Sequence, residues 1–511
     1  MAETPVNSRA TPVEFQDIQG LVRFGFKHHT EASFLLLRVK NPPAARAWIA
    51  QASVTSAVTQ DPPPPTALQL AFTYEGLRAL QVPEDIAAGF SMEFVAGMSG
   101  NANRARRLGD LGPNDSSRWR WGTGARAPHA GVFLYALPGR LQAWQQSIEA
   151  EIEPGFELIS SLATADMGGT EPFGFIDGIS QPQIDWNRER TAIDQDLLDY
   201  TNLTCLGEFL LGYPNEYALY TPRPLLDPRR DAHGILPSAE DAPDMKDLGR
   251  NGSYLVLRQL RQDVFGFWQA LDRYAAGRPD LRARLAEAMV GRTLQGEPLA
   301  GLLYEVIAGN ASKSDPDLNA FTYRSDPQGV RCPLGAHIRR TNPRNADLPP
   351  GSEGLIGRLV RMLGFNAKAR RQDLIASIRF HRLLRRGREY GAKISLERAV
   401  NGQSDGAESG LQFMCLGGNI ERQFEFVQSA WVVSAKFDGL ADQADPLLGN
   451  RLPGSGGGRS DSFSIPQDDG PDQRLDTLPP FVTVLGGAYF FLPGIRALRF
   501  LSQVSSASAW R

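Results

Sequence analysis

The stretch Ser33-Phe-Leu-Leu-Leu-Arg38 recurs later in the chain as Ser253-Tyr-Leu-Val-Leu-Arg258. Each copy is a short apolar run bounded by polar residues, which is typical of a buried β-strand. A helix-like stretch follows each run. In the second copy Val264, Trp268 and Leu271 keep the i, i+4, i+7 spacing of a buried helix face. The pattern predicts one strand–helix unit in each half of the chain.

A second unit of the same kind follows in each half. Residues 131–137 precede a helix-like pattern over 141–152, and residues 410–416 precede another over 420–431. Two such halves predict a duplicated α+β domain, although strand–helix order is common and so short a match also arises by chance. The aperiodic segment 221–243 separates the halves. We therefore expect an N-terminal domain over 1–220 and a C-terminal domain over 221–511.

The composition excludes several classes of protein. The 511 residues are 42% hydrophobic and 22% charged, which is typical of a folded globular chain. The net charge of −3 is close to neutral and predicts no polyanion-binding role for the chain as a whole. No run approaches the roughly 18 apolar residues of a membrane span, and the N-terminus shows no secretory signal, so we expect a cytoplasmic protein without membrane contact. The absence of GxxxxGK[ST] and of a GxGxxG between strand and helix argues against nucleotide chemistry.

The metal-binding residue types narrow the chemistry further. The three cysteines form no CxxC pair, which excludes a cysteine zinc site and the attachment motif of a c-type haem. The six histidines include no HExxH and no pair at i+3 or i+4, which argues against a multi-histidine zinc site. His381 falls in an alternating segment, 378–384, that predicts a strand. His337 follows a Pro/Gly loop; a lone histidine is usually structural, but haem iron needs only one.

A basic segment follows His337. From Arg331 to Val400 there are 16 Lys/Arg and 5 Asp/Glu, an excess of 11. This pattern fits a solvated basic face, a nucleic-acid patch or a site that neutralises an anionic ligand. Nucleic-acid modules usually place aromatic residues among the basic ones, and few occur here. We therefore favour an anionic ligand and expect no nucleic-acid partner.

The segment Gly168-Gly-Thr-Glu-Pro-Phe-Gly-Phe-Ile-Asp-Gly-Ile-Ser-Gln-Pro182 surrounds one carboxylate, Asp177, with glycines and apolar side chains. The glycines permit sharp turns or a close approach to a ligand. An apolar environment raises the pKa of a carboxyl group, so that it can exchange protons near neutral pH. The alternative is an ordinary Asp-Gly turn.

These motifs resemble those of a known family, the dye-decolourising peroxidases. Gly174-Phe-Ile-Asp177-Gly178 resembles the family's GxxDG signature, and His337 in AHIRRTNPR resembles its proximal haem ligand. Leu384-Arg385-Arg386-Gly387 resembles its distal-arginine motif. The resemblance extends from about Asp17 to Leu501, with the motifs in the expected order.

The resemblance implies two ferredoxin-like α+β domains with antiparallel sheets and one non-covalent haem b per chain, wedged mainly in the C-terminal half. It implies a peroxidase that reduces hydrogen peroxide and oxidises dyes, phenols and similar aromatic reductants. Asp177 would be the acid/base, Arg385 would stabilise charge, and His337 would bind the iron. We also expect Gly178, Ile179 and Arg339 to lie beside the cofactor. The oligomeric state stays open.

One departure concerns the distal arginine. His337 and Arg385 are 48 positions apart, and residues 345–372 between them resemble an insertion. Three further arginines are therefore alternatives: Arg379, Arg382 and Arg386. We choose Arg385 because it follows Leu383-Leu384 and precedes Arg-Gly, as the family pattern requires.

Four further residues are assigned with open alternatives. Leu411 and Phe413, two apart on an expected strand, point to one face and line either the distal pocket or the ordinary core. Asp445 is the expected hydrogen-bond partner of His337, unless it caps a helix or a turn. Tyr390 is a potential electron-transfer residue for bulky reductants, unless it is only an amphipathic residue at a strand edge.

A different class of protein shares part of this pattern. A non-enzymatic haem-binding or haem-handling protein of the same fold would need His337 but not the pair of Asp177 and Arg385. The presence of both residues favours the peroxidase.

Overall fold

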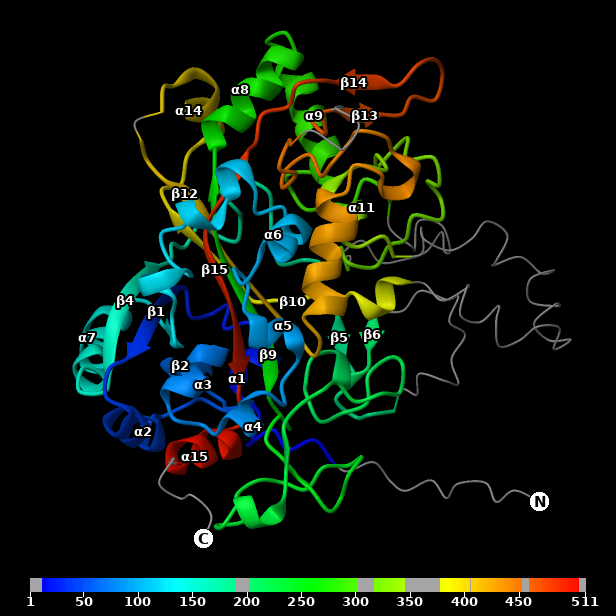
Figure 1. Cartoon of the computed structure of the whole chain (residues 1–511). Coiled ribbons are helices and arrows are strands. Elements are labelled where there is room, and N and C mark those ends of the chain that lie inside the picture. Colours follow the sequence, from blue (N-terminus) through cyan, green and yellow to red (C-terminus); the bar gives the residue numbers. More distant parts are fainter. Residues whose placement is uncertain are drawn as a thin grey trace, which may run out of the picture.

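The computed structural model describes residues 12–189, 202–301, 317–344, 377–404, 406–452 and 459–504. The expected insertion, 345–372, lies outside these residues. Two units with the same strand order make up the main sheet (Figure 1). Among the described residues, no helix is long and apolar enough to cross a membrane.

The first unit contains four antiparallel strands in the spatial order β4-β1-β3-β2. Its main elements are β1 (Glu31–Val39), α2 (Pro42–Gln51), β2 (Thr66–Phe72), β3 (Ala130–Ala136), α7 (Leu141–Ile152) and β4 (Phe156–Ala163). The repeated run at residues 33–38 is β1, and all seven residues of β3 are buried. This continuous burial explains why β1 and β3 are apolar along most of their length rather than alternating.

The second unit repeats this topology. Its main elements are β9 (Ser253–Gln262), α8 (Val264–Tyr274), α9 (Pro279–Val290), β10 (Leu384–Arg385), β11 (Arg388–Gly391), β12 (Ser409–Gly417), the π-helical η7 (Glu421–Glu425) and η8 (Val427–Val433), and β15 (Val482–Leu492). The strand order is β10-β12-β9-β15, with β11 also paired to β12. Counted within each unit, both sheets follow the antiparallel order 4-1-3-2 of a ferredoxin-like fold, so the expected fold class is confirmed.

The two sheets are joined at one point. Phe491 of β15 pairs with Phe72 of β2, and this contact makes one nine-stranded sheet from both units. The sheet is visible along the length of the molecule in Figure 1. The domain boundary at residue 220 stays a prediction.

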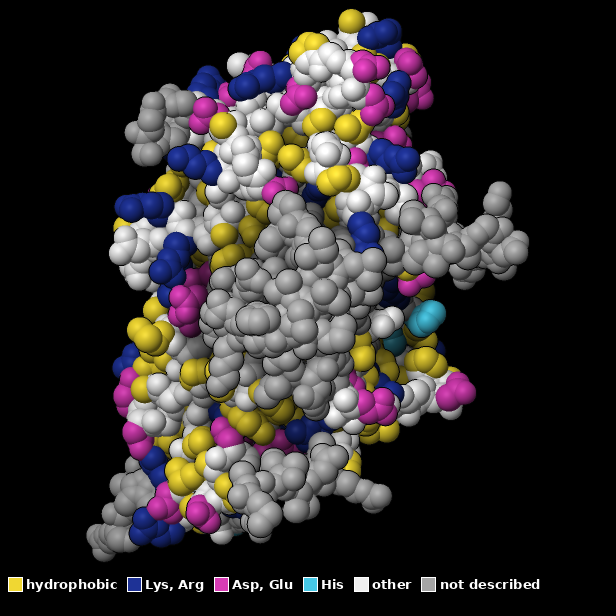
Figure 2. Space-filling model, turned by 90° about the vertical axis from the view of Figure 1, so that its right-hand side faces the viewer, with side chains coloured by type: hydrophobic (Ala, Val, Ile, Leu, Met, Phe, Trp, Pro, Cys, Tyr) yellow, Lys and Arg dark blue, Asp and Glu magenta, His cyan; other side chains and the backbone are white. Residues whose placement is uncertain are grey.

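Shorter elements surround this sheet. They are α1 (Gly20–Arg23), α3 (Tyr74–Ala79), α4 (Glu84–Ala87), α5 (Met92–Ala96), α6 (Ala102–Leu108), β5 (Gln183–Ile184), β6 (Leu203–Thr204), β7 (Leu225–Leu226), β8 (Lys246–Asp247), α11 (His337–Thr341), α14 (Leu396–Asn401), β13 (Phe463–Ile465), β14 (Gln473–Leu475) and α15 (Ile495–Gln503). On the face in Figure 2, basic and acidic side chains are interspersed among the described residues.

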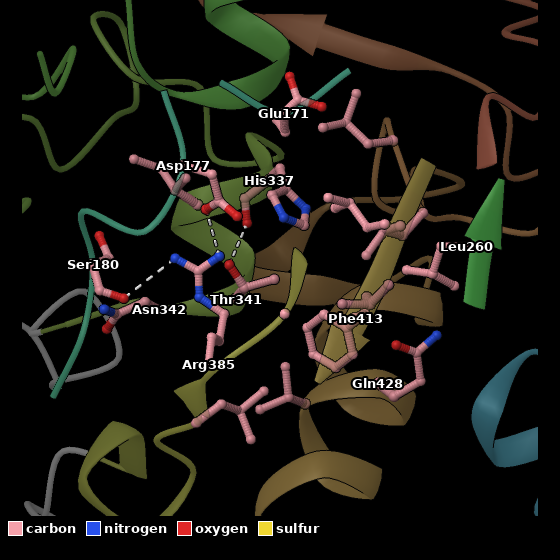
Figure 3. Close-up of a pocket in the computed structure, with 18 of the residues that line it drawn as sticks. Glu171, Asp177, Ser180, Leu260, His337, Thr341, Asn342, Arg385, Phe413 and Gln428 are labelled. Carbon is pink, nitrogen blue, oxygen red and sulfur yellow. Dashed lines mark hydrogen bonds and ion pairs between the residues drawn. The ribbon is translucent and has the colours of Figure 1, made fainter. Parts of the chain in front are cut away.

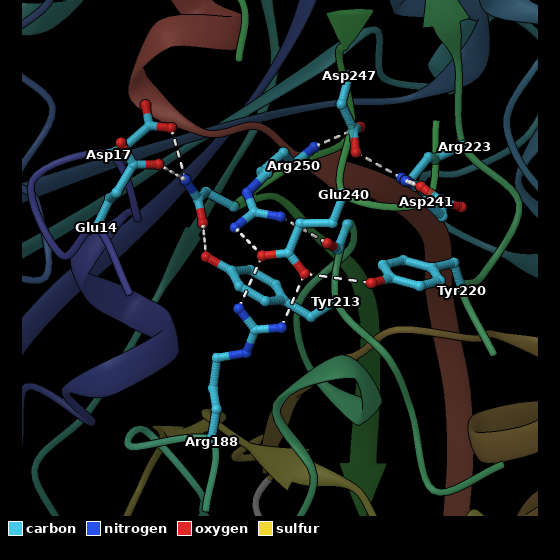
Figure 4. A network of polar contacts seen from close by, with 12 residues as sticks. Glu14, Asp17, Arg188, Tyr213, Tyr220, Arg223, Glu240, Asp241, Asp247 and Arg250 are labelled. Carbon is cyan, nitrogen blue, oxygen red and sulfur yellow. Dashed lines mark hydrogen bonds and ion pairs between the residues drawn. The ribbon is translucent and has the colours of Figure 1, made fainter. Parts of the chain in front are cut away.

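Buried ion pairs hold the irregular region between the units (Figure 4). Arg188 donates to both carboxylate oxygens of Glu240, at 2.7 and 2.8 Å, and Arg250 donates to the same carboxylate at 2.8 Å. Both guanidinium groups also lie over the ring of Tyr213, at 5.1 and 4.2 Å from its centroid. These contacts fix a segment that has little regular secondary structure of its own.

The strand expected over 378–384 is wrong for most of its length. Residues Ser377–Phe380 form a 3₁₀ turn, and only Leu384 of this range belongs to β10. His381 is buried with its ring stacked on Phe426, the centroids 3.6 Å apart. Because tertiary stacking and a hydrogen bond from His381 Nδ1 to the Arg422 carbonyl fix this segment, its alternating pattern does not decide its structure.

Candidate active site

A mostly apolar cavity of about 280 Å³ lies in the second unit, closed on one side by the loop that carries Asp177 (Figure 3). Its walls come from the loop at 171–182, from β9 and β12, from the start of α11, and from η8. Ile176 remains 40% exposed in this wall. The cavity therefore offers an apolar surface to a large ligand.

His337 enters the cavity as the first residue of α11, directly after the Pro/Gly loop. Its Nδ1 lies 2.9 Å from Oδ2 of the fully buried Asp445. Burial alone would raise the pKa of Asp445, but His337, Arg340 and the backbone N–H of Leu448 hold it at about 2. An ionised carboxylate only accepts hydrogen bonds, so Nδ1 carries a proton, and in a neutral imidazole this arrangement leaves the lone pair on Nε2.

Asp177 and Arg385 meet at the same cavity (Figure 3). Nη1 of Arg385 donates to Oδ1 of Asp177 at 2.8 Å, and the backbone N–H of Gly178 donates to the same oxygen at 2.6 Å. Gly178 has a φ of +78°, which favours glycine. Burial would raise the pKa of Asp177, but Arg385 and the Gly178 N–H outweigh it and lower the pKa. The carboxylate therefore stays ionised into the acidic range.

The backbone around Arg385 is locked to the Asp177 loop. The backbone N–H of Arg385 donates to the side-chain oxygen of Gln181, and the side-chain amide of Gln181 donates to the Arg385 carbonyl, both at 3.1 Å. Of the alternative arginines, Arg386 instead donates to the carbonyls of Leu21 and Val22, at 2.7 and 2.8 Å. Arg382 lines the cavity but contacts Thr204, and the buried Arg379 is not among the lining residues.

The structure brings together most of the residues expected from the sequence, but not all of them. Ile179, Leu411 and Phe413 line the cavity with Asp177, His337 and Arg385. Arg339 is buried and turned away, because its guanidinium donates to the carbonyls of Asp326 and Cys332, both at 2.9 Å. Tyr390 is 7% exposed and is not among the lining residues.

Glu171 and Arg292 are among the polar lining residues that the sequence analysis did not single out. Glu171 accepts hydrogen bonds within the Asp177 loop, and Arg292 donates to Ser180 Oγ at 2.8 Å. Glu171 is the only acidic residue besides Asp177 in the Gly168–Pro182 segment, and this was an available signal. Arg292 follows the end of α9 without any distinguishing pattern.

The donor set fits haem better than a bare metal ion. Among the described residues, no group of three or more His, Cys, Asp or Glu side chains could hold an ion. A single histidine with a free Nε2, set in an apolar cavity, is the donor set that haem iron requires. The cationic and amide side chains of Arg292, Arg382 and Asn342 also line the cavity and suit the carboxylates of such a cofactor.

Known proteins resemble most of this chain in sequence. Dye-decolorizing peroxidase msp1 of Mycetinis scorodonius is 27% identical over 97% of this chain and 89% of its own. Multifunctional dye peroxidase DyP2 of Amycolatopsis sp. is 31% identical over 72% of this chain and 69% of its own. No family model matches the sequence.

The fold has solved counterparts. The crystal structure of a fungal DyP-type peroxidase from Auricularia auricula-judae superposes with a TM-score of 0.70 and 24% identity, covering 96% of this chain and 100% of that one. On the strength of these relationships, the protein belongs to the dye-decolourising peroxidase family and is a haem peroxidase that reduces hydrogen peroxide and oxidises aromatic compounds.

Proposed function

We propose that the Asp177–Arg385 pair performs the peroxide chemistry of this haem peroxidase and that His337 is the ligand of the iron. One observation carries the proposal: an acid paired with a permanent cation, and a histidine backed by a buried carboxylate, line the same cavity. Together they match what peroxide reduction requires.

The residues that would hold haem follow from this cavity. His337 would bind the iron through Nε2, and Ile179, Leu411 and Phe413 would offer apolar contact to the macrocycle. Arg292 and Arg382 also line the cavity and would neutralise the propionates. Bound there, haem supplies the coordination position at which peroxide becomes more acidic and is reduced.

Asp177 is arranged to move the proton of the peroxide. Its Oδ1 is occupied by Arg385 and Gly178, and no hydrogen bond to Oδ2 is recorded among the described residues. Its side chain is 34% exposed, so Oδ2 is accessible to a small substrate. Oδ2 would accept a proton from one oxygen of the peroxide and return it to the other oxygen, which departs as water.

Arg385 has two effects on the same reaction. Its charge stabilises the negative charge that develops on the departing oxygen. It also keeps Asp177 ionised, because a neighbouring cation lowers the pKa of a carboxyl group. Asp177 is therefore a base that remains available at acidic pH.

The haem-handling alternative is separated from the peroxidase by one experiment. Haem-loaded protein is given hydrogen peroxide and 2,6-dimethoxyphenol, the phenol bound in one related peroxidase structure. The proposal expects peroxide-dependent oxidation of the phenol that Asp177→Asn lowers by about 100-fold while haem stays bound. Haem binding with equal oxidation rates in both proteins would contradict the proposal.

A further inference from the structure

We infer that Glu171 is a positioning residue for Asp177: its carboxylate fixes the turn that precedes Asp177 in the loop. The inference rests on the acid/base role proposed for Asp177. Glu171 itself lines the cavity wall, and Figure 3 shows it near Asp177.

The chain wraps around the Glu171 carboxylate. Oε2 accepts the backbone N–H of Phe173 and Oε1 that of Phe175, each at 3.0 Å. The backbone closes the same turn, since the Glu171 N–H donates to the Phe175 carbonyl and the Gly174 N–H donates to the Glu171 carbonyl, both at 2.8 Å. Gly174, with a φ of +102°, completes the turn. The Glu171 side chain thus accepts hydrogen bonds from two backbone N–H groups of the turn, those of Phe173 and Phe175.

The turn is fastened to the second unit by two contacts. Gln262, the last residue of β9, donates from Nε2 to Glu171 Oε2 at 2.6 Å. Trp268 of α8 donates from Nε1 to the Phe173 carbonyl at 3.1 Å. The carboxylate therefore connects the Asp177 loop to the end of a central strand, which is a rigid support.

Asp177 lies two residues beyond this fastened turn. Its own backbone N–H donates to the Gly169 carbonyl at 3.2 Å, and Thr170 bridges Ile176 across the two arms of the loop. A shift of Phe175 therefore displaces Asp177 relative to Arg385. A displacement of about 1 Å at a reacting group can cost on the order of 100-fold in rate.

The two carboxylates also interact electrostatically. Burial, with a smaller contribution from the charge of Asp177, raises the pKa of Glu171 to about 7, although the hydrogen bonds from Gln262, Phe173 and Phe175 lower it. Such an acid is costly to bury. The three donors that surround it offset this cost, and they do so in the loop that carries the acid/base.

The test is Glu171→Gln in the haem-loaded enzyme, which keeps the side-chain shape but replaces one acceptor by a donor. We expect the second-order rate with hydrogen peroxide to fall by about 10-fold. Haem content, the visible spectrum and KM for 2,6-dimethoxyphenol stay unchanged. The rate of cyanide binding, which also needs a distal base, falls in parallel. The double variant Glu171→Gln with Asp177→Asn reacts no more slowly than Asp177→Asn alone, because both changes act on one group.

A matched control is Glu208→Gln. Glu208 is also buried, its pKa is also raised by burial to about 7, and its carboxylate holds the backbone N–H of Glu216 at 2.9 Å and Arg422. It is not among the lining residues of the cavity. This variant should lower the melting temperature but not the rate with peroxide.

Two results would overturn the inference. The first is a parental rate with peroxide in Glu171→Gln. The second is that Glu171→Gln lowers this rate by the same factor in the parent and in the Asp177→Asn background. If Glu171→Gln does not fold, Gln262→Leu replaces it, because this change removes the 2.6 Å hydrogen bond from Gln262 to Glu171. We expect a smaller fall in the rate with peroxide, and the same two results would overturn the inference. A parental rate in Asp177→Asn would instead refute the proposed function, so the two failures are distinguishable.

Discussion

Arg385 donates from Nη1 to Oδ1 of Asp177 across 2.8 Å, although 208 positions separate the two residues in the chain. The contact joins the loop after the first unit to strand β10 of the second. It places a permanent cation beside a carboxylate that lines the same cavity as His337. The proposed site for peroxide therefore needs residues from both halves of the chain.

Replacing Arg385 should change the pH dependence of the reaction. Arg385 lowers the pKa of Asp177, so Arg385→Leu raises it, and the base becomes protonated at a higher pH. The acidic limb of kcat/KM for hydrogen peroxide should move to higher pH, and the plateau should fall by about 100-fold. Arg385→Lys keeps the charge and should leave the limb nearer its parental position. An unmoved limb in Arg385→Leu would show that another group controls Asp177.

Replacing His337 should remove the histidine ligand of the iron. His337→Ala leaves no imidazole Nε2 in the cavity, so we expect loss of haem or of the histidine signature in electron paramagnetic resonance. His233→Ala is the control, because His233 is exposed and remote in the sequence. Histidine ligation that persists in His337→Ala would assign the ligand to a different residue.

The buried carboxylate behind His337 should tune the iron. In Asp445→Asn the Nδ1–H loses an ionised acceptor at 2.9 Å, which makes the imidazole a weaker electron donor. The reduction potential of the haem should therefore rise, as measured by potentiometric titration, while the histidine signature remains. An unchanged potential would show that the Asp445 hydrogen bond only orients the ring.

Tyr390 remains a proposed electron-transfer residue. It is buried beside the Arg120–Glu408 ion pair, and burial together with Glu408 raises the pKa of its hydroxyl. If electrons pass through it, Tyr390→Phe lowers turnover of a bulky anthraquinone-type dye and leaves oxidation of 2,6-dimethoxyphenol nearly intact. Equal ratios of the two rates in parent and variant would remove Tyr390 from the path.

Much of this arrangement was predictable from the sequence, for identifiable reasons. The strands at 33–38 and 253–258 are apolar because both faces of the sheet are covered, and this pattern is visible in the residues. The pairing of Phe491 with Phe72 was not predictable, because a single long-range contact leaves no periodic signal. Arg339 lies two residues after His337 in the same motif, so we expected it beside the cofactor. On the short α11 its guanidinium instead donates to the carbonyls of Asp326 and Cys332.

The central claim is that Asp177 and Arg385 together make peroxide reactive in this cavity. The most direct measurement is stopped-flow absorbance of the haem-loaded parent, Asp177→Asn and Arg385→Leu, each mixed with hydrogen peroxide and no reductant. We predict that all three retain haem and that the spectral change induced by peroxide is slower in each variant by about 100-fold or more. Rates within a few-fold of the parent in both variants would contradict the claim.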